Sequence, residues 1–409
     1  MSETAGDPPA LVVETTRVDD IRPLVPLVDP RHPLVFIRRG QGIAGIGEAL
    51  RLTFSGPSRM RDAAAAWKRV AALARVSDPL GLPGTGLVAL GAFTFADSSP
   101  DTSVLIVPSV VIGRRDGVSW VTRINAAPAP VETPLGPDFS VKFDFGPLDR
   151  PGYVAAVEAA LVHLRAGELS KVVLARSMIG QLPDGADLRV LLGELAEGYP
   201  DTWTFAVDGL IGSSPETLIT AHRGSVTARV LAGSAPRGAD PNADQDAAAA
   251  LATSPKDLDE HQFALRSLLA SLGSHATNIT ASEQPFTLKL PNLWHLASDV
   301  EGDLTDGASS LDLIAALHPT AAVAGTPTPT ALSLIAELEP VDRGRYAGPV
   351  GWVGADGDGE WAIALRSAEV SPAGVITAWA GAGIVADSDP DRELAETRMK
   401  FRPVIDAFA

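Results

Sequence analysis

The sequence from Ala380 to Lys400 reads AGAGIVADSDPDRELAETRMK and joins a glycine-rich turn to a helix with functional groups on one face. The triplet Asp-Pro-Asp at 389–391 is a good helix start, because the first turn tolerates proline and favours acidic residues. Glu393, Glu396 and Lys400 then stand at positions i, i+3 and i+7, so two carboxylates and an ammonium share one side of the helix. A solvated salt-bridge face is the alternative to a binding site for this pattern.

A second helix with acidic residues is predicted by SPKDLDEHQFALRSLLASL, which begins at Ser254. Ser254 is suited to the N-cap, and the proline after it to the first turn. The apolar stripe of this helix consists of Phe263, Leu265, Leu268, Leu269 and Leu272. Asp257 and Glu260 lie three positions apart on the other side. Magnesium prefers a few hard carboxylate oxygens and keeps waters and anionic substrate oxygens, so one acid from each helix would suit it. A charged helix surface is the alternative.

Nine short motifs follow one another along the chain. They are SKVVLARS with Lys171, GSSPETL with Glu216, VLAGSAPRG with Gly233, SPKDLDEH with Glu260, LPNLWHLAS with His295, LHPTAAVAGTP with His318, RYAGPVGW with Tyr346, GEWAIALRSAEV with Arg366, and GAGIV...ELAETRMK with Gly383 and Lys400. This ordered series resembles the chorismate-utilising enzymes, the group that contains isochorismate, salicylate, anthranilate and aminodeoxychorismate synthases. The resemblance runs from about Tyr153 to the C-terminus.

The resemblance implies an α+β fold, in which large antiparallel sheets pack face to face and helices surround them, as in anthranilate synthase component I. Strand and helix patterns that alternate irregularly agree with this better than a repeating βαβ pattern. We expect residues 1–10 to form a disordered tail and residues 11–147 to contribute strands and a helix to a common core. Residues 148–409 are expected to form the chorismate-binding catalytic region.

Three positions favour isochorismate synthase, an isomerase, within this group. Lys171 stands where isochorismate and salicylate synthases carry their general base. Ala232 occupies the place of the nucleophilic lysine of aminodeoxychorismate synthases, and Ala322 the place where salicylate synthases tend to have threonine. Tyr346 is also found in salicylate synthases, so salicylate synthase stays open as an alternative. An amination enzyme with a glutaminase partner and a non-catalytic small-anion binding protein are more remote alternatives.

On the family's pattern, Lys171 and Glu216 perform the chemistry. Lys171 would deprotonate the water that attacks C2 of chorismate, and Glu216 would protonate the C4 hydroxyl as it leaves. The base must begin as a neutral amine, so burial or a neighbouring cation should lower its pKa. The acid must begin protonated, so an apolar surrounding should raise its pKa. The structural alternatives are an edge-strand lysine kept for solubility and a glutamate that starts a turn after Pro215.

The resemblance also implies a magnesium ion that bridges the protein and the substrate. Glu260 and Glu396 would be its inner ligands, and Asp257 and Glu393 would be outer ligands that act through water. The ion would neutralise the ring carboxylate of chorismate and stabilise charge that develops during the displacement. Chorismate carries two carboxylates and this chain has a net charge of −17, so the site needs local cations.

Substrate contacts are implied for Gly233, His295, Ala322, Tyr346, Arg366, Gly383 and Lys400. Arg366, with Tyr346, would grip the enolpyruvyl carboxylate, because a guanidinium matches a carboxylate in bidentate geometry. Gly233 and Gly383 would let the backbone approach and offer amide donors. His295 would contact the ring region, with a neutral core histidine as the alternative. His318, in a His-Pro-Thr turn, is expected to be structural.

Composition indicates a cytoplasmic enzyme. The chain has 409 residues, 45% of them hydrophobic but only in short runs, so it can bury a large core without a membrane span. The polar start MSETAGDPPA is unlike a signal peptide. The absence of cysteine excludes disulfides and thiol chemistry, and a pI near 4.8 argues against nucleic acid as a partner. The resemblance favours a monomer without a glutaminase subunit.

The N-terminal third contains a misleading glycine motif. Gly40, Gly42 and Gly45 spell GxGxxG after the apolar run LVFI, as in a dinucleotide-binding turn. That fold needs a helix directly after the glycines, whereas Gly47 and the alternating apolar residues from Leu50 to Phe54 predict a second strand. We therefore expect a hairpin there, followed by an amphipathic helix over residues 60–76.

Overall fold

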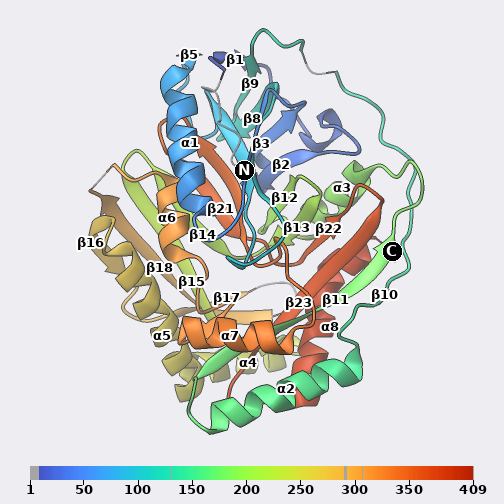
Figure 1. Cartoon of the computed structure of the whole chain (residues 1–409), viewed down its shortest axis with the longest axis vertical. Coiled ribbons are helices and arrows are strands. Elements are labelled where there is room, and N and C mark those ends of the chain that lie inside the picture. Colours follow the sequence, from blue (N-terminus) through green and yellow to red (C-terminus); the bar gives the residue numbers. More distant parts are fainter. Residues whose placement is uncertain (1–8, 130, 290–292, 306, 409) are drawn as a thin grey trace.

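The structure is a computed structural model that describes residues 9–129, 131–289, 293–305 and 307–408. Most of the tail expected over residues 1–10 therefore lies outside the described residues. The described chain forms two large β-sheets with helices around them (Figure 1). Only the short edge strand β5 pairs in parallel, with β1, and the other described pairs are antiparallel.

The first sheet has 13 strands. In spatial order they are β10 (Asp144–Phe145), β11 (Lys171–Gln181), β23 (Val375–Ile384), β22 (Ser367–Val370), β13 (Leu210–Ser214), β12 (Trp203–Val207), β2 (Leu34–Arg38), β3 (Gln41–Ile46), β8 (Val110–Arg115), β9 (Val118–Ile124), β1 (Val12–Val18) and β5 (Arg75–Ser77), while β19 (Gly325–Thr326) pairs with β11. This sheet carries the predicted base at the start of β11 and the glycine-rich end of β23.

The second sheet has 10 strands. They are β16 (Ala276–Ala281), β18 (Leu293–Leu304), β15 (Ser225–Pro236), β14 (Thr217–His222), β21 (Gly359–Ile363), β20 (Pro349–Gly354), β6 (Val88–Ala92), β7 (Ser103–Val107) and β4 (Leu50–Phe54), while β17 (Phe286–Lys289) pairs with β18. Apolar side chains of both sheets share one buried cluster, which contains Phe36 and Phe205 of the first sheet and Leu90 and Trp352 of the second. The sheets therefore pack face to face, as predicted.

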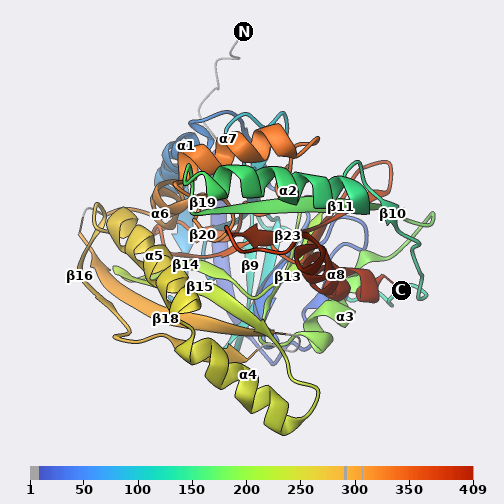
Figure 2. The same ribbon diagram turned by 90° about the horizontal axis from the view of Figure 1, so that it is seen from below.

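The helices are α1 (Arg59–Leu73), α2 (Arg150–Arg165), α3 (Leu188–Gly198), α4 (Pro241–Thr253), α5 (Pro255–Leu272), α6 (Ser310–Leu317), α7 (Thr328–Leu338) and α8 (Pro390–Ala407), with a short 3₁₀ helix η1 at Val25–Leu27. Figure 1 shows α2, α4, α5 and α7 gathered at one end of the molecule, opposite β8 and β9. Figure 2 shows α2 and α7 side by side across that end, where they contact each other. The α+β class predicted from the sequence is confirmed.

The N-terminal third is interleaved with the rest of the chain in both sheets. β2 pairs with β12 in the first sheet, and β6 pairs with β20 in the second. The short strand β10 also pairs with β11, so strands from residues 11–147 share hydrogen bonds with strands from residues 148–409 along three separate seams. Removing either part would leave long, apolar strand edges without partners.

The GxGxxG motif forms a hairpin and not a dinucleotide-binding turn. β2 pairs with β3 antiparallel, with Arg38 opposite Gln41, and the glycines are followed by strand β4 before helix α1 begins. A Cβ at Gly42 would lie 2.3 Å from the carbonyl oxygen of Phe36, so this position requires glycine. The second strand of the hairpin was predicted too late in the sequence. The partner of β2 is β3, whereas Leu50–Phe54 forms β4 of the second sheet. Helix α1 also ends earlier than predicted, at Leu73, since Arg75–Ser77 pairs with β1.

Helices α5 and α8 begin where the sequence predicts. The side chain of Ser254 accepts a hydrogen bond from the amide of Asp257 at 3.3 Å, and that of Asp389 accepts one from the amide of Arg392 at 2.9 Å. Leu265, Leu268 and Leu272 are buried as expected, but Phe263 is 53% exposed. The apolar stripe of α5 is therefore narrower than its sequence suggested.

Candidate active site

A cavity of about 1220 Å³, its open mouth included, lies between α5, α8 and the ends of β11, β15 and β23. Every catalytic, substrate and metal residue expected from the sequence lines it. These are Lys171 (β11), Glu216 (after β13), Gly233 (β15), Asp257 and Glu260 (α5), His295 (β18), Ala322 (after α6), Tyr346 (before β20), Arg366 (after β21), Gly383 (β23), and Glu393, Glu396 and Lys400 (α8). Segments separated by more than 200 residues in the sequence therefore meet in one place.

Two glycines make room for charged side chains. Gly383 lies in the β11–β23 ladder, and a Cβ there would lie 2.8 Å from Cε of Lys171. Gly233 has a positive φ of 80°, and a Cβ there would lie 3.1 Å from Cβ of Asp257. The backbones of β23 and β15 can thus approach the side chains that face them because these positions lack a side chain.

Both lysines expected in the site are ion-paired with carboxylates that were expected to bind metal. Lys171 Nζ donates to Glu260 Oε1, which joins β11 to α5 across the cavity. Lys400 Nζ lies 2.5 Å from Glu396 Oε1 and also donates to the carbonyl oxygen of Gly381 at 3.0 Å. In each pair both side chains are partly exposed to the cavity. A cation that entered between α5 and α8 would compete with these lysines.

The acidic side chains fit the chemistry of a hard divalent cation. Asp257 and Glu260 come from α5, and Glu393 and Glu396 from α8, so carboxylates of two helices face one cavity. Burial raises the pKa of Glu393, and the neighbouring Glu396 adds to this rise, as expected for like charges close together. Within the described ranges, no three acidic or histidine side chains lie close enough together to hold a metal ion as they stand. The carboxylate oxygens are therefore the kind of ligand that magnesium prefers, but the four side chains would have to move closer together to coordinate the ion.

Glu216 has the electrostatic environment expected of a general acid. Burial raises its pKa to about 7, although the cations Lys171, Lys400 and Arg366 oppose this rise. Its amide donates to the side chain of Ser214 at 3.2 Å, which holds the turn after β13. A carboxyl group with this pKa is partly protonated at neutral pH and can donate a proton.

Arg366 lines the cavity. Its φ of 50° places it in the left-handed region, which is unusual for a residue other than glycine. Among the described residues no carboxylate forms an ion pair with this guanidinium. Burial lowers the pKa of Arg366, and nearby acidic groups oppose this effect. An anionic ligand would supply the missing partner.

Tyr346 and His295 are neutral polar groups in the cavity wall. Burial raises the pKa of Tyr346 to about 12, so its hydroxyl stays protonated and can donate. The ring of Tyr346 stacks on Trp379, with centroids 5.7 Å apart. Burial, with Arg366 and Lys400 nearby, lowers the pKa of His295 to about 4. His295 is therefore an uncharged imidazole. His318 lies outside the cavity lining and bonds to the carbonyl oxygen of Phe95 at 2.9 Å, which agrees with a structural role.

Among the charged and aromatic side chains of the lining, sequence reasoning missed three: Lys256, Arg343 and Trp379. Lys256 sits between the predicted N-cap and Asp257, so its place in the first turn of α5 could have indicated it. Arg343 and Trp379 carry no such signal, since they reach the cavity from a turn and a strand whose partners are distant in sequence. With them, five cations and five acids line the cavity, in a chain of net charge −17.

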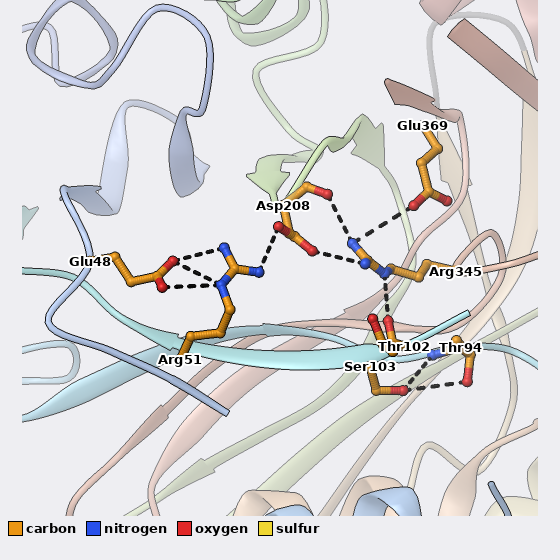
Figure 3. A network of polar contacts seen from close by, with 8 residues as sticks. All are labelled: Glu48, Arg51, Thr94, Thr102, Ser103, Asp208, Arg345 and Glu369. Carbon is orange, nitrogen blue, oxygen red and sulfur yellow. Dashed lines mark hydrogen bonds and ion pairs between the residues drawn. The ribbon is translucent and has the colours of Figure 1, made fainter. Parts of the chain in front are cut away.

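A second charged cluster ties the two sheets together around Arg345, which precedes Tyr346 in the sequence (Figure 3). Arg345 donates to the carbonyl oxygen of Thr102 at 3.0 Å and to the carboxylate of Asp208 at 2.8 Å. The same carboxylate accepts from Arg51 at 2.8 Å, and Arg51 also pairs with Glu48 at 2.8 Å. Each guanidinium in this cluster has a carboxylate partner, which is the arrangement of a structural element.

Comparisons with known proteins agree with the geometry. A family model for chorismate binding enzymes matches residues 141–409. Isochorismate synthase DhbC of Bacillus subtilis is 40% identical over 268 residues, 63% of this chain and 67% of that protein. Isochorismate synthase EntC of Escherichia coli K12 is 36% identical over 247 residues, 59% of this chain and 63% of that protein.

Solved structures show the same arrangement of the whole chain. The structure of DhbC from Bacillus anthracis has a TM-score of 0.78 and 32% identity, and the match covers 94% of this chain and 98% of that one. MenF of Escherichia coli has a TM-score of 0.80 at 23% identity, over 97% of this chain and 95% of that one, which supports the fold. The chain belongs to the chorismate-binding enzyme family.

Proposed function

We propose that this protein is an isochorismate synthase that isomerises chorismate to isochorismate. The observation that carries the proposal is the placement of Lys171 and Glu216 in one cavity, with the pKa of Glu216 raised to about 7 by burial. A base that activates water and an acid that protonates a departing hydroxyl are the two groups this isomerisation needs. Relatives named isochorismate synthase, including DhbC and EntC, support the same activity.

In the proposed reaction, Lys171 accepts a proton from the water that attacks C2. The ring double bonds shift, and the C4 hydroxyl leaves as water after protonation by Glu216. The atoms balance, because one water enters and one departs. Glu260 accepts a hydrogen bond from the amine of Lys171, and the backbone of Gly383 lies beside the Lys171 side chain. Both contacts orient the amine toward the cavity. His295 stays neutral and contributes a hydrogen-bonding group without adding charge.

Binding of the substrate dianion rests on Arg366, Tyr346 and the backbone of β23. Arg366 holds the enolpyruvyl carboxylate, and the protonated hydroxyl of Tyr346 donates to it. With Lys171 neutral as the base and Glu216 protonated as the acid, four cations and four carboxylates remain in the lining. Glu260 and Glu396, with Asp257 and Glu393 behind them, would hold a magnesium ion, which would supply two further charges and neutralise the ring carboxylate of chorismate. Lys400 stays beside Glu396 and adds a cation at that end.

The product feeds either menaquinone synthesis or the synthesis of a catecholate or salicylate siderophore. We propose that the enzyme is cytoplasmic and acts as a monomer without a glutaminase subunit. The relatives named isochorismate synthase support the absence of a glutaminase subunit. None of the described helices is both long and apolar enough to cross a bilayer.

The test is to incubate the purified protein with chorismate and magnesium, without ammonia, and to identify products by chromatography with a coupled assay for pyruvate. Isochorismate without pyruvate supports the proposal, and EDTA should abolish the activity until magnesium is restored. Salicylate with equimolar pyruvate would make the protein a salicylate synthase. Activity only with ammonia or a glutaminase would place it in the amination branch, and no turnover would favour an anion-binding protein.

A further inference from the structure

The buried ion pair between Glu339 and Arg343 borders the cavity and has no part in the proposed chemistry. Both side chains are almost fully buried, at 3% and 2% exposure. Arg343 Nη2 lies 2.6 Å from Glu339 Oε1, and Arg343 Nε lies 2.8 Å from Oε2, so guanidinium and carboxylate meet at two points. The guanidinium carbon also lies 4.4 Å from the ring centroid of Phe95. These contacts hold both side chains in one geometry.

This pair takes the place of a missing strand beside β11. Strand β19 pairs with β11 only at Lys171 and Val172. Beyond that point, Arg343 Nη2 donates to the carbonyl oxygen of Val173 at 2.7 Å, and the amide of Ala175 donates to Glu339 Oε1 at 2.8 Å. One backbone acceptor and one backbone donor are thus satisfied by side chains where a neighbouring strand would do so. The ion pair extends the edge of the sheet beside the strand that carries Lys171.

The same pair fixes two further segments of the cavity wall. Arg343 Nη1 donates to the carbonyl oxygen of Val323 at 2.9 Å, next to Ala322. The amide of Tyr346 donates to the carbonyl oxygen of Arg343 at 3.0 Å, so Tyr346 belongs to the turn that Arg343 anchors. Three segments that are distant in sequence are therefore held by one guanidinium and its carboxylate.

We propose that Glu339 and Arg343 are positioning residues that set Tyr346 and Ala322 at a fixed distance from Lys171. This inference rests on the proposed function for its kinetic consequence, although its geometric part does not. Arg343 borders the cavity, but its donors are turned toward Glu339, Val173 and Val323. It therefore acts through the residues it holds and not as a ligand of the substrate.

The kinetic signature of positioning differs from that of general destabilisation. A loosened wall would displace Tyr346 and Ala322 from the substrate, so the KM for chorismate should rise. A displacement of about 1 Å can cost on the order of 100-fold in rate or affinity. A variant that merely unfolds more easily would lose active molecules, which lowers the apparent kcat and leaves KM unchanged. A split between KM and kcat therefore separates the two explanations.

The experiment compares Arg343→Met, Arg343→Lys and the control Arg51→Gln with the unmodified protein. Arg51 forms an ion pair at the far end of the cluster in Figure 3 and lies outside the cavity lining. We expect KM for chorismate to rise about 10-fold or more in Arg343→Met. Arg343→Lys should raise KM by an intermediate factor, because lysine keeps the charge but lacks the planar, forked guanidinium. Arg51→Gln should keep the original KM.

An unchanged KM in both Arg343 variants, with only kcat or thermal stability reduced, would overturn the proposal. If Arg343→Met does not fold, Arg343→Lys decides alone, and a KM within experimental error of the unmodified value counts against positioning. Hydrogen exchange supplies a readout that needs no turnover. Peptides that contain Ala175 and Tyr346 should exchange faster in the Arg343 variants than in Arg51→Gln, and equal exchange would overturn the geometric part even if the protein proves not to isomerise chorismate.

Discussion

The cavity and the cluster around Arg345 are both rich in charged side chains, but Arg366 of the cavity and Arg345 of the cluster differ in whether a carboxylate pairs with them. In the cluster, Arg345 is 6% exposed and donates to Asp208 and to a backbone carbonyl (Figure 3). In the cavity, Arg366 has no carboxylate partner among the described residues. The cost of a buried charge is offset within the protein in the first case and is left for a ligand in the second. Incomplete pairing therefore distinguishes the binding site from the structural cluster.

The pKa values of the buried carboxylates in the two regions shift in opposite directions. Burial acts to raise the pKa of Asp208, but Arg345 and Arg51 outweigh it and hold that pKa below its usual range. Burial raises the pKa of Glu216 to about 7 and outweighs the opposing effect of Lys171, Lys400 and Arg366. Asp208 is thus fixed as an anion that ties the sheets together, whereas Glu216 can exchange a proton near neutral pH.

The largest expected effect is the loss of turnover in Glu216→Gln. Glutamine cannot donate a proton to the departing hydroxyl, so kcat should fall by about 1,000-fold or more. Lys171→Ala should abolish turnover to a similar degree. Steady-state assays with chorismate and magnesium measure both, and magnesium binding measured by calorimetry should change little. Turnover within tenfold of the original in Glu216→Gln would remove its assignment as the acid.

Arg366→Gln should lower kcat/KM for chorismate by about 100-fold, mainly through KM. The variant loses a charge-assisted contact to a carboxylate, worth about 3 kcal/mol at most. Arg51→Gln is the matched control, since the same substitution in the structural cluster removes ion pairs without touching the cavity. Equal KM values in the two variants would contradict the difference between the regions.

The pH profile should show the state of Glu216. A general acid acts in its protonated form, so kcat/KM should fall about tenfold per pH unit above the pKa near 7. The folded-state pKa lies above the ordinary value of 4.5, so the stability that Glu216 contributes at low pH is lost as pH rises toward 7. Glu216→Gln should therefore melt at a higher temperature than the unmodified protein at pH 8, and a lower melting temperature there would argue against a buried, ionisable Glu216.

Asp208→Asn should affect stability and leave catalysis intact. The substitution removes the anion shared by Arg345 and Arg51, which should cost about 2 kcal/mol of unfolding free energy, since Asp208 is partly exposed. Urea unfolding at neutral pH measures this loss. The KM and kcat for chorismate should stay close to their original values, and a large change in either would mean that the cluster also shapes the cavity.

Ala322→Thr should have the smallest effect, a change in the products. The family resemblance implies that salicylate synthases tend to have threonine at this position, so a fraction of the turnover should end in pyruvate release. The coupled pyruvate assay detects it against a background without pyruvate in the unmodified protein. A variant that makes no pyruvate would show that Ala322 does not decide the product by itself.

Local patterns in the sequence were enough for several elements. Ser254 and Asp389 start their helices as predicted, because a cap depends on a few neighbouring residues. The spacing of Glu393, Glu396 and Lys400 placed them on one helix face, and all three line the cavity. The order of the nine motifs indicated the family, which the match to residues 141–409 confirms.

Other features depended on contacts between distant parts of the chain. Phe263 fits the apolar period of α5 but is exposed, because α5 meets its neighbours along a narrower strip. The helix expected over residues 60–76 ends at Leu73, because Arg75–Ser77 forms strand β5 and pairs with β1. Periodicity records which side chains could be buried, and only the packed neighbours determine which of them are.

The sequence by itself determined the family, the helix starts and most of the charged residues that line the cavity. The tertiary structure decided which charges are paired. It joined Lys171 to Glu260 and Lys400 to Glu396, and it left Arg366 without a carboxylate among the described residues. The physical reason is that pairing and burial depend on distances between segments far apart in the chain, and these distances are set by the packing of the two sheets.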